Sequence, residues 1–314
     1  MTSENRTIWL LGPQYHQPTL GELYEKLDLP DGPIAVVTAG WQEREGEDEE
    51  LDGHLGGRSL DLELYRRADR VFREDPEFRE AHREMQHKLR EVEGLYDLRL
   101  SYVVGSVRRL LKAEGLEELL RPEQEHAIEQ LRELDAWHLK RILDIRGEFE
   151  TTLKPLEREV IAREREEIRT ILEGAPALVI TGGHVAVLLN RLRLFGMKEL
   201  ARDKTIVAWS AGAMVLTERV VLFHDHPPQG PGNAEVMEEG LGLCPRLVAL
   251  PDGKKRLDLS EEDGVASFAN RFLPAYCIVM GDGDCVAFDG ETFSAEEGVL
   301  RLSPNGTVEK VTSW

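Results

Sequence analysis

The sequence predicts an α/β fold whose parallel sheet is interrupted by a large helical insertion. Short apolar runs at 7–12 and 33–39 are typical of buried strands, and a helix-forming stretch at 20–27 lies between them. Strand, helix and strand in this order indicate a parallel layer. From 59 to 173 the apolar residues instead recur at three- and four-residue spacing, as they do in packed helices.

The chain therefore divides into three predicted segments. Residues 1–58 form the first part of the α/β domain, 59–173 a helical insertion of four or five helices, and 174–314 the rest of the α/β domain. The acidic, glycine-containing stretch 43–58 is predicted to be an exposed or disordered loop, and 98–104 is a candidate third strand. The insertion fits a lid or a homodimerisation arm, and equally a helical cover over the core.

The α/β pattern resumes after the insertion. An amphipathic helix is expected through Leu188 and Leu192. From 284 onward apolar and polar residues alternate between glycine turns, which predicts an antiparallel hairpin at the edge of the sheet. Apolar runs predict strands at 177–181, 205–209, 220–223, 247–250 and 277–280.

The composition limits the classes of partner and compartment. The formal net charge of −20 disfavours nucleic acid and anionic membrane surfaces as partners. No apolar run approaches the roughly 20 residues that a membrane-spanning helix needs, and the first residues lack the apolar core of a signal peptide. Three cysteines without metal-binding spacing argue for a reducing compartment, so a cytoplasmic protein is expected. Alternating Arg and Glu at 163–167 are typical of a solvated helix face.

The stretch around Ser210 has the pattern of a nucleophile elbow. Ser210 directly follows the apolar run that ends at Trp209, and small residues open the next helix. A nucleophilic serine on so sharp a turn needs small neighbours. The N–H of Ala211 would then be free to stabilise an oxyanion. An ordinary tight strand–helix junction that contains a serine is the alternative interpretation.

A second turn of small residues, Gly182-Gly183-His184, follows the predicted strand at 177–181. A glycine pair lets backbone N–H groups approach a ligand closely. Because the carboxyl ends of neighbouring parallel strands meet at one edge of a sheet, this turn is expected near Ser210. Glycine is common in strand–helix turns, so the pair is a weak signal by itself.

In this order the segments resemble the peptidase E and cyanophycinase family of serine hydrolases. The resemblance rests on 179–184 and 209–213, and more loosely on 240–245 and 280–284. It implies a parallel-sheet three-layer sandwich, the class I glutamine amidotransferase-like fold. The helical insertion at 59–173 has no counterpart of that size in the family.

The resemblance also implies a substrate class and roles for single residues. Family members cleave short peptides at acidic residues, or β-aspartyl linkages, without a metal or other cofactor. The expected substrate is therefore a small peptide or an acidic small molecule. The resemblance implies Ser210 as the nucleophile. It implies an oxyanion region at Gly182, Gly183 and Ala211, and acidic binding residues at Asp225 and Asp282.

One position departs from the family pattern. Where the family has a histidine, after the strand at 247–250, this chain has Pro251-Asp252. A serine hydroxyl needs an adjacent general base, and carboxylates, with pKa values of about 4 in peptides, suit that task poorly near neutral pH. No histidine follows His226 in the sequence. We therefore assign Asp252 to substrate binding and look elsewhere for the base.

Three histidines are candidates for the missing base. His184 adjoins the glycine turn, although it could equally be a helix cap or a ligand-binding side chain. His224 and His226 flank Asp225 and share one face of an extended stretch, so they could border the pocket or bind a metal, or be solvated loop residues. The predicted catalytic set is Ser210, His184, His226 and Asp225, with His224 assigned to binding and no metal site. The histidines of the insertion lack the spacing of a helical metal site and are predicted to be surface or packing residues: His82, His87, His126 and His138.

Three functional hypotheses follow. The first is a serine hydrolase with a rearranged catalytic set. The second is a catalytically inactive relative that binds a small acidic ligand or a partner protein through the same pocket. The third, an α/β-hydrolase esterase, fits least, because Ala208 replaces the first glycine of the G-x-S-x-G motif and no late histidine is present. A glutamine amidotransferase is disfavoured because that chemistry uses cysteine where this chain has Ser210.

Overall fold

The computed structural model describes residues 7–224, 232–296 and 298–314. In this part of the chain the largest sheet has seven strands in the order β11-β10-β1-β5-β4-β2-β3. The five strands from β1 to β3 in that order run parallel, and β10 and β11 add an antiparallel edge. The predicted α/β fold with a parallel sheet is confirmed. The strands are β1 (Ile8–Leu11), β2 (Ile34–Val37), β3 (Ser59–Asp61), β4 (Ala177–Ile180), β5 (Thr205–Trp209), β10 (Cys285–Phe288) and β11 (Phe293–Ala295).

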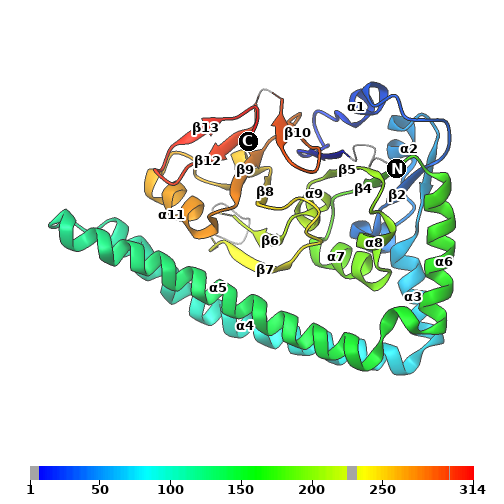
Figure 1. Cartoon of the computed structure of the whole chain (residues 1–314), viewed down its shortest axis with the longest axis horizontal. Coiled ribbons are helices and arrows are strands. Elements are labelled where there is room, and N and C mark those ends of the chain that lie inside the picture. Colours follow the sequence, from blue (N-terminus) through cyan, green and yellow to red (C-terminus); the bar gives the residue numbers. More distant parts are fainter. Residues whose placement is uncertain (1–6, 225–231, 297) are drawn as a thin grey trace.

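Helices cover both faces of this sheet and make three layers (Figure 1). Alternate residues of a strand point to opposite faces, and in β2 Ile34 and Val36 pack with α1 (Leu20–Lys26) and α2 (Glu49–His54). Ala35 and Val37 belong to the larger core on the other face. That core includes residues of α3 (Leu64–Glu74), α6 (Glu159–Gly174), α7 (Val185–Leu194), α8 (Met197–Leu200) and α9 (Ala211–Leu216).

Two smaller sheets complete the α/β part. β8 and β9 are parallel to each other and belong to a four-stranded sheet with the order β13-β12-β9-β8. β6 and β7 form an antiparallel pair. The predicted strands at 247–250 and 277–280 therefore exist but pair outside the main sheet. These elements are β6 (Arg219–Leu222), β7 (Glu235–Glu239), β8 (Leu247–Pro251), α10 (Gly253–Arg256), α11 (Glu262–Phe272), β9 (Tyr276–Met280), β12 (Leu300–Leu302) and β13 (Val308–Lys310).

The insertion contains a long antiparallel helical hairpin formed by α4 (Pro76–Leu111) and α5 (Glu117–Leu153). Figure 1 shows the hairpin along the lower side of the molecule, with its tip projecting beyond α11. Between 64 and 174, a range described throughout, α3, α4, α5 and α6 are joined by short turns, one of them the 3-10 turn η2 (Pro155–Glu157). The predicted strand at 98–104 is wrong, because this stretch lies inside α4.

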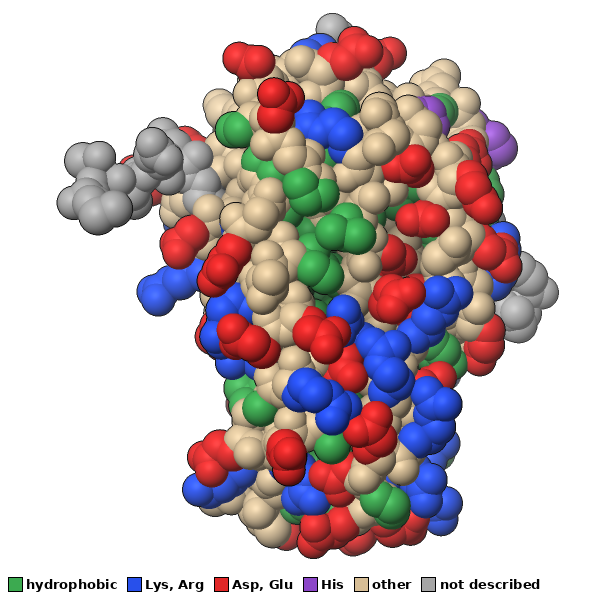
Figure 2. Space-filling model, turned by 90° about the vertical axis from the view of Figure 1, so that its right-hand side faces the viewer, with side chains coloured by type: hydrophobic (Ala, Val, Ile, Leu, Met, Phe, Trp, Pro, Cys, Tyr) green, Lys and Arg blue, Asp and Glu red, His purple; other side chains and the backbone are tan. Residues whose placement is uncertain are grey.

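Two local expectations need correction in the described residues. The stretch 43–58 is not simply a loop: the 3-10 turn η1 (Ala39–Arg44) runs into it and α2 lies within it, because Leu51 and Leu55 are buried against the sheet. The charged stretch 163–167 is not wholly solvated, because Glu164 is buried and pairs with Arg67. Figure 2 shows the side of the molecule where α3 and α6 lie, with acidic and basic side chains intermingled over its lower half.

Within the described ranges, no helix combines the length and the apolar character that crossing a membrane would require.

Candidate active site

Ser210 occupies a sharp turn between β5 and α9. Its backbone angles are φ 50° and ψ −119°, in a region that residues with a side chain rarely adopt. The side chain is half-buried, so the hydroxyl is held by the turn without being sealed in the core. A strained turn between a strand and a helix is what a nucleophile elbow requires. It distinguishes Ser210 from a serine in an ordinary helix start, where φ is negative.

The glycines around Ser210 are required by close packing. A Cβ atom on Gly182 would lie 3.0 Å from Ser210 Cβ and 3.6 Å from Ser210 Oγ. A Cβ atom on Gly212 would overlap the backbone carbonyl of Ile180. The turn after β4 and the turn after β5 therefore touch, as the sequence predicted for Gly182 and Ser210.

The predicted oxyanion residues lie on turns at the same edge of the sheet as Ser210. Ala211 is the first residue of α9, and the first N–H groups of a helix have no acceptor within it. Gly183 has φ 113°, which only glycine adopts readily, and a Cβ there would overlap the Gly40 carbonyl. The predicted oxyanion residues Gly182, Gly183 and Ala211 thus lie on the two turns that meet at Ser210.

His184 is exposed and caps α7. Its N–H donates to the Gly40 carbonyl over 2.7 Å, and its Nδ1 accepts the Val187 N–H over 3.4 Å. An imidazole that accepts through Nδ1 carries its proton on Nε2 when it is neutral. In this arrangement Nε2 is a donor, so His184 could take a proton from Ser210 only after the cap is released.

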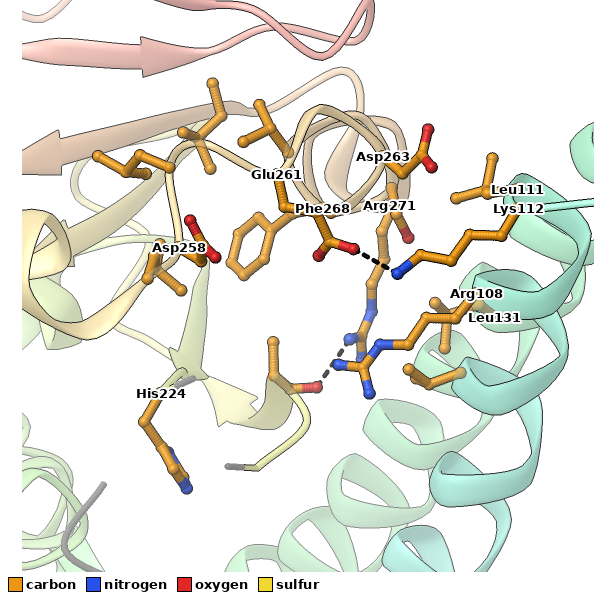
Figure 3. Close-up of a pocket in the computed structure, with 18 residues that line it drawn as sticks. Arg108, Leu111, Lys112, Leu131, His224, Asp258, Glu261, Asp263, Phe268 and Arg271 are labelled. Atoms are coloured by element: carbon orange, nitrogen blue, oxygen red, sulfur yellow. Dashed lines mark hydrogen bonds and ion pairs between the residues drawn. The ribbon is translucent and has the colours of Figure 1, made fainter. Parts of the chain in front are cut away.

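His224 lies in a different pocket from the Ser210 turn. Figure 3 shows its ring at the edge of a cavity between α4 and α11, on the side away from the ion pair of Lys112 and Glu261. The lining of this cavity, about 90 Å³ in volume, includes none of the other predicted site residues that the structure describes. Asp225 and His226 lie outside the described residues.

Asp252 and Asp282 share one lysine at the carboxyl ends of β8 and β9. Lys255 Nζ lies 2.9 Å from Asp282 Oδ2 and 3.2 Å from Asp252 Oδ1. Its hydrogen bonds to Asp282 and Asp252 raise the pKa of Lys255, so the ammonium group stays charged. Oδ1 of Asp282 is buried without a hydrogen-bond partner among the described residues, whereas the buried Oδ1 of Asp252 faces the Lys255 ammonium group. These two predicted binding residues therefore form a compact ionic group with Lys255.

Asp252 itself has a left-handed backbone, with φ 59° and ψ 18°. Aspartate tolerates this conformation better than most side chains. Its N–H donates to the Met280 carbonyl over 2.7 Å, which fixes the end of β8 against the end of β9. Asp252 is thus held by both its backbone and its side chain.

Gln42 is a further residue at this edge of the sheet that was not among the predicted site residues. It has φ 60° and ψ −122°, nearly the conformation of Ser210, and it is half-buried two residues after Gly40. A Cβ on Gly40 would lie 2.5 Å from the Gly182 carbonyl oxygen, so the turn after β2 packs on the turn after β4. Trp41 and Trp209 belong to one apolar cluster on this side of the sheet. The available signal was a glycine two or three residues after the end of a strand, at Gly40 as at Gly182 and Gly212.

The end of β1 reaches the same edge from the other side. Leu11 pairs with Trp209, and the next residue, Gly12, donates its N–H to the Asp284 carbonyl over 2.9 Å. A Cβ on Gly12 would overlap the Gly281 carbonyl. The turn that carries Asp282 is therefore anchored to the strand next to the one that carries Ser210.

Among residues 7–224, 232–296 and 298–314, no three histidine, cysteine, aspartate or glutamate side chains are grouped so that they could hold a metal ion. The described site presents a serine hydroxyl, backbone N–H groups at the turns and the ionic group at Lys255.

The sequence matches no known protein-family profile, and no curated protein matches it. Among solved structures the chain is similar to a peptidase from an acI-B1 actinobacterium, at 14% identity and a TM-score of 0.47, over 99% of this chain and 96% of the other. It is also similar to a Listeria monocytogenes EGD-e protein assigned provisionally to peptidase E, at 12% identity and a TM-score of 0.45, over 95% of this chain and 100% of the other. At such identities the likeness concerns the overall fold and carries no information about the site.

Proposed function

We propose that the chain is a serine hydrolase that cleaves short peptides through Ser210. The observation that supports this best is the backbone of Ser210, at φ 50° and ψ −119° between β5 and α9. Strain of this kind costs on the order of 1–3 kcal/mol and persists only where the surrounding structure imposes it. The absence of a side chain on Gly182 leaves the room that Ser210 Cβ needs in this conformation.

In the proposed reaction, Ser210 Oγ attacks the carbonyl carbon of a peptide bond and its proton passes to a base. The N–H groups of Ala211 and Gly183 are the proposed donors to the resulting oxyanion. The leaving amine takes a proton as the C–N bond breaks, and water then hydrolyses the ester on Ser210. The family resemblance favours acidic or β-aspartyl substrates.

The base is proposed from the predicted histidines. His184 adjoins the Ser210 turn through Gly182 and Gly183, but it would have to give up its cap on Val187. His226 is the second proposal for the base. The cytoplasm is the proposed compartment. The three cysteines all fall within the described residues and are buried: Cys244, Cys277 and Cys285.

The test is covalent labelling of Ser210. A fluorophosphonate probe should modify the full chain at Ser210, located by peptide mass spectrometry, and Ser210→Ala should abolish the modification. Ser260→Ala is the matched control, because Ser260 is an exposed serine whose hydroxyl bonds locally to Asp258. Absence of labelling at every pH up to about 9, where a hydroxyl next to any base is most nucleophilic, would refute the proposal.

Two further measurements identify the substrate class and the general base. If the resemblance holds, Asp-X and β-aspartyl dipeptides should be hydrolysed faster than Ala-X dipeptides. His184→Ala and His226→Ala should differ in their effect on kcat: loss of a general base typically costs 10²–10⁴-fold, whereas loss of a helix cap leaves kcat nearly unchanged.

A second candidate is a non-catalytic protein that binds a small acidic ligand in the same place. The ionic group of Asp252, Lys255 and Asp282 supports it, because a carboxylate held by a lysine stands where the family has its base. This candidate applies if the probe does not label the chain and no dipeptide is hydrolysed. Binding of aspartate or of an Asp-X dipeptide, measured by calorimetry, would then support it. Turnover that Ser210→Ala abolishes would exclude it.

A further inference from the structure

One face of α4 exposes three large apolar side chains. Leu95 is 54% exposed, Leu98 65% and Tyr102 81%. Single exposed apolar residues are common on protein surfaces, but a row of them on one helix marks an interaction site. The buried residues of this stretch, including Tyr96 and Leu100, lie on the opposite side of α4 and pack on α5 and on the α/β part.

The exposed face has the spacing of a coiled-coil seam. Stepping along α4 by four and three residues in turn gives the positions of what we call the α4 seam: Glu91, Leu95, Leu98, Tyr102, Gly105 and Arg109. This alternation keeps side chains in line on one face of a helix that packs against another helix. Five of the six seam residues are exposed, and a Cβ on the sixth, Gly105, would meet no atom within 4 Å.

The seam is complementary to itself when it is reversed. Suppose that two α4 helices lie antiparallel along their seams and cross at the level of Leu100. Each seam residue then faces the partner residue that is equally far from position 100 in the other direction along the sequence. Glu91 then faces the partner's Arg109, Leu98 faces the partner's Tyr102, and Leu95 faces the partner's Gly105. Opposite charges meet at both ends, apolar groups meet in the middle, and the glycine leaves room for the leucine.

The parallel arrangement lacks this complementarity. Each Glu91 would face the same residue of the partner, as would each Arg109, so like charges would meet at both ends. Gly105 would face glycine and leave a gap in the seam. Neither Glu91 nor Arg109 has an ion-pair partner among the described residues, so both are available for an intermolecular pair.

We propose that two copies of the chain associate through the α4 seam in antiparallel register, about a two-fold axis at Leu100. A two-fold interface uses the same patch on both copies, as this pairing does. The seam is about 27 Å long at 1.5 Å per residue, which is short for a protein interface. A reversible dimer with a Kd on the order of 1–10 μM is therefore expected.

Sedimentation of the full chain over about 1–100 μM tests the association, a range that brackets the expected Kd. Leu98→Glu should weaken the dimer at least tenfold. Leu119→Glu is the matched control and should leave Kd unchanged, because Leu119 is 64% exposed on α5 and lies outside the seam. Helix content by circular dichroism and the melting temperature confirm that each variant is folded. A wild-type chain that stays monomeric throughout, or a dimer that Leu98→Glu does not weaken, overturns the proposal.

Charge reversal tests the register. Glu91→Arg and Arg109→Glu should each weaken the homodimer, because each places like charges opposite one another. A mixture of the two single variants should form heterodimers, because every end pair is then of opposite charge, and the double variant should recover wild-type affinity. In a parallel seam neither single variant would change the like-charge contacts, so unchanged homodimers would overturn the antiparallel register.

Discussion

Arg271 of α11 and Asp135 of α5 form a two-pronged ion pair that ties the helical hairpin to the α/β part. Arg271 Nε lies 2.7 Å from Asp135 Oδ2, and Arg271 Nη2 lies 2.7 Å from Asp135 Oδ1. Their side chains are 4% and 3% exposed. Tyr96 of α4 donates to Asp135 and accepts from Arg271, so both arms of the hairpin take part. The position of the hairpin is thus fixed by a buried polar contact as well as by apolar packing.

Breaking this pair should destabilise the protein strongly. Asp135→Asn leaves the Arg271 cation buried without its counter-charge, and such a loss typically costs about 3–5 kcal/mol of unfolding free energy. The double variant Asp135→Leu with Arg271→Leu should cost less, because no buried charge is left unpaired. Urea unfolding measures both.

The control for this prediction is an exposed pair on the same helix. Lys140 and Asp144 of α5 lie 2.7 Å apart with side chains 64% and 63% exposed. Asp144→Asn should change the unfolding free energy by about 0.5 kcal/mol or less, because solvent screens such pairs. Equal effects of Asp135→Asn and Asp144→Asn would show that the buried pair does not anchor the hairpin.

The strained backbone at Ser210 predicts that glycine at this position is better for stability than alanine. Ser210→Gly should be more stable than Ser210→Ala by about 1 kcal/mol, because glycine adopts a positive φ without a steric penalty and alanine does not. Both variants lack the hydroxyl, so the comparison isolates the backbone. The difference between their unfolding free energies in urea is the measurement. A Ser210→Ala variant as stable as Ser210→Gly would contradict the strained backbone at this position.

The strands next to the site could be predicted because each carries a local signal. β2, β4 and β5 are short apolar runs followed at once by small residues, and the contact between the turns at Gly182 and Ser210 follows from parallel pairing. The ionic group at Lys255 could not be predicted in this way, because Lys255 and Asp282 are separated by 27 positions. Whether two such side chains meet depends on which strands pair.

The incorrect strand at 98–104 has a related physical cause. Val103 and Val104 favour strands locally, because branching at Cβ restricts their rotamers in a helix. Burial against α5 decides otherwise: Leu100, Val104 and Val107 fall at helical spacing and pack in one cluster with residues of the facing helix. Packing with a distant segment overrides local propensity here.

The half-buried position of His82 predicts a loss of stability in acid. Its ring packs among Phe72, Phe78 and Phe149, and burial, with nearby Arg191 and Arg146, lowers the pKa of His82 to about 4. The unfolded chain, with a histidine pKa of about 6.5, binds more protons between these values. Stability should therefore rise from pH 4 to pH 6.5, by on the order of 2 kcal/mol from this residue.

The comparison of His82→Phe with the wild type measures this contribution. Urea unfolding at several pH values should show a smaller rise for His82→Phe across that window, because the variant has no proton to bind at this position. His87→Gln is the control, since His87 is exposed on the same helix, and it should keep the wild-type slope. An unchanged slope in His82→Phe would contradict the expected pKa.

Glu45 predicts the opposite dependence on pH. It is 1% exposed at the start of α3, where its two carboxylate oxygens accept the N–H groups of Tyr65 and Arg66 over 2.8 and 2.7 Å. Burial outweighs these bonds and raises the pKa of Glu45 to about 7. Between about pH 4.5 and 7 the folded chain binds more protons than the unfolded chain, so stability should fall as the pH rises through this window.

Glu45→Gln should remove this fall, because the variant has no carboxyl group to ionise. The unfolding free energy that Glu45→Gln loses relative to the wild type should become smaller, by on the order of 2 kcal/mol, between pH 5 and pH 8. Glu47→Gln is the control, because the Glu47 side chain is 58% exposed and should leave the slope unchanged. Urea unfolding at both pH values gives the differences. A disadvantage of Glu45→Gln that instead grew toward pH 8 would mean that the two N–H groups stabilise the Glu45 carboxylate by more than its burial costs.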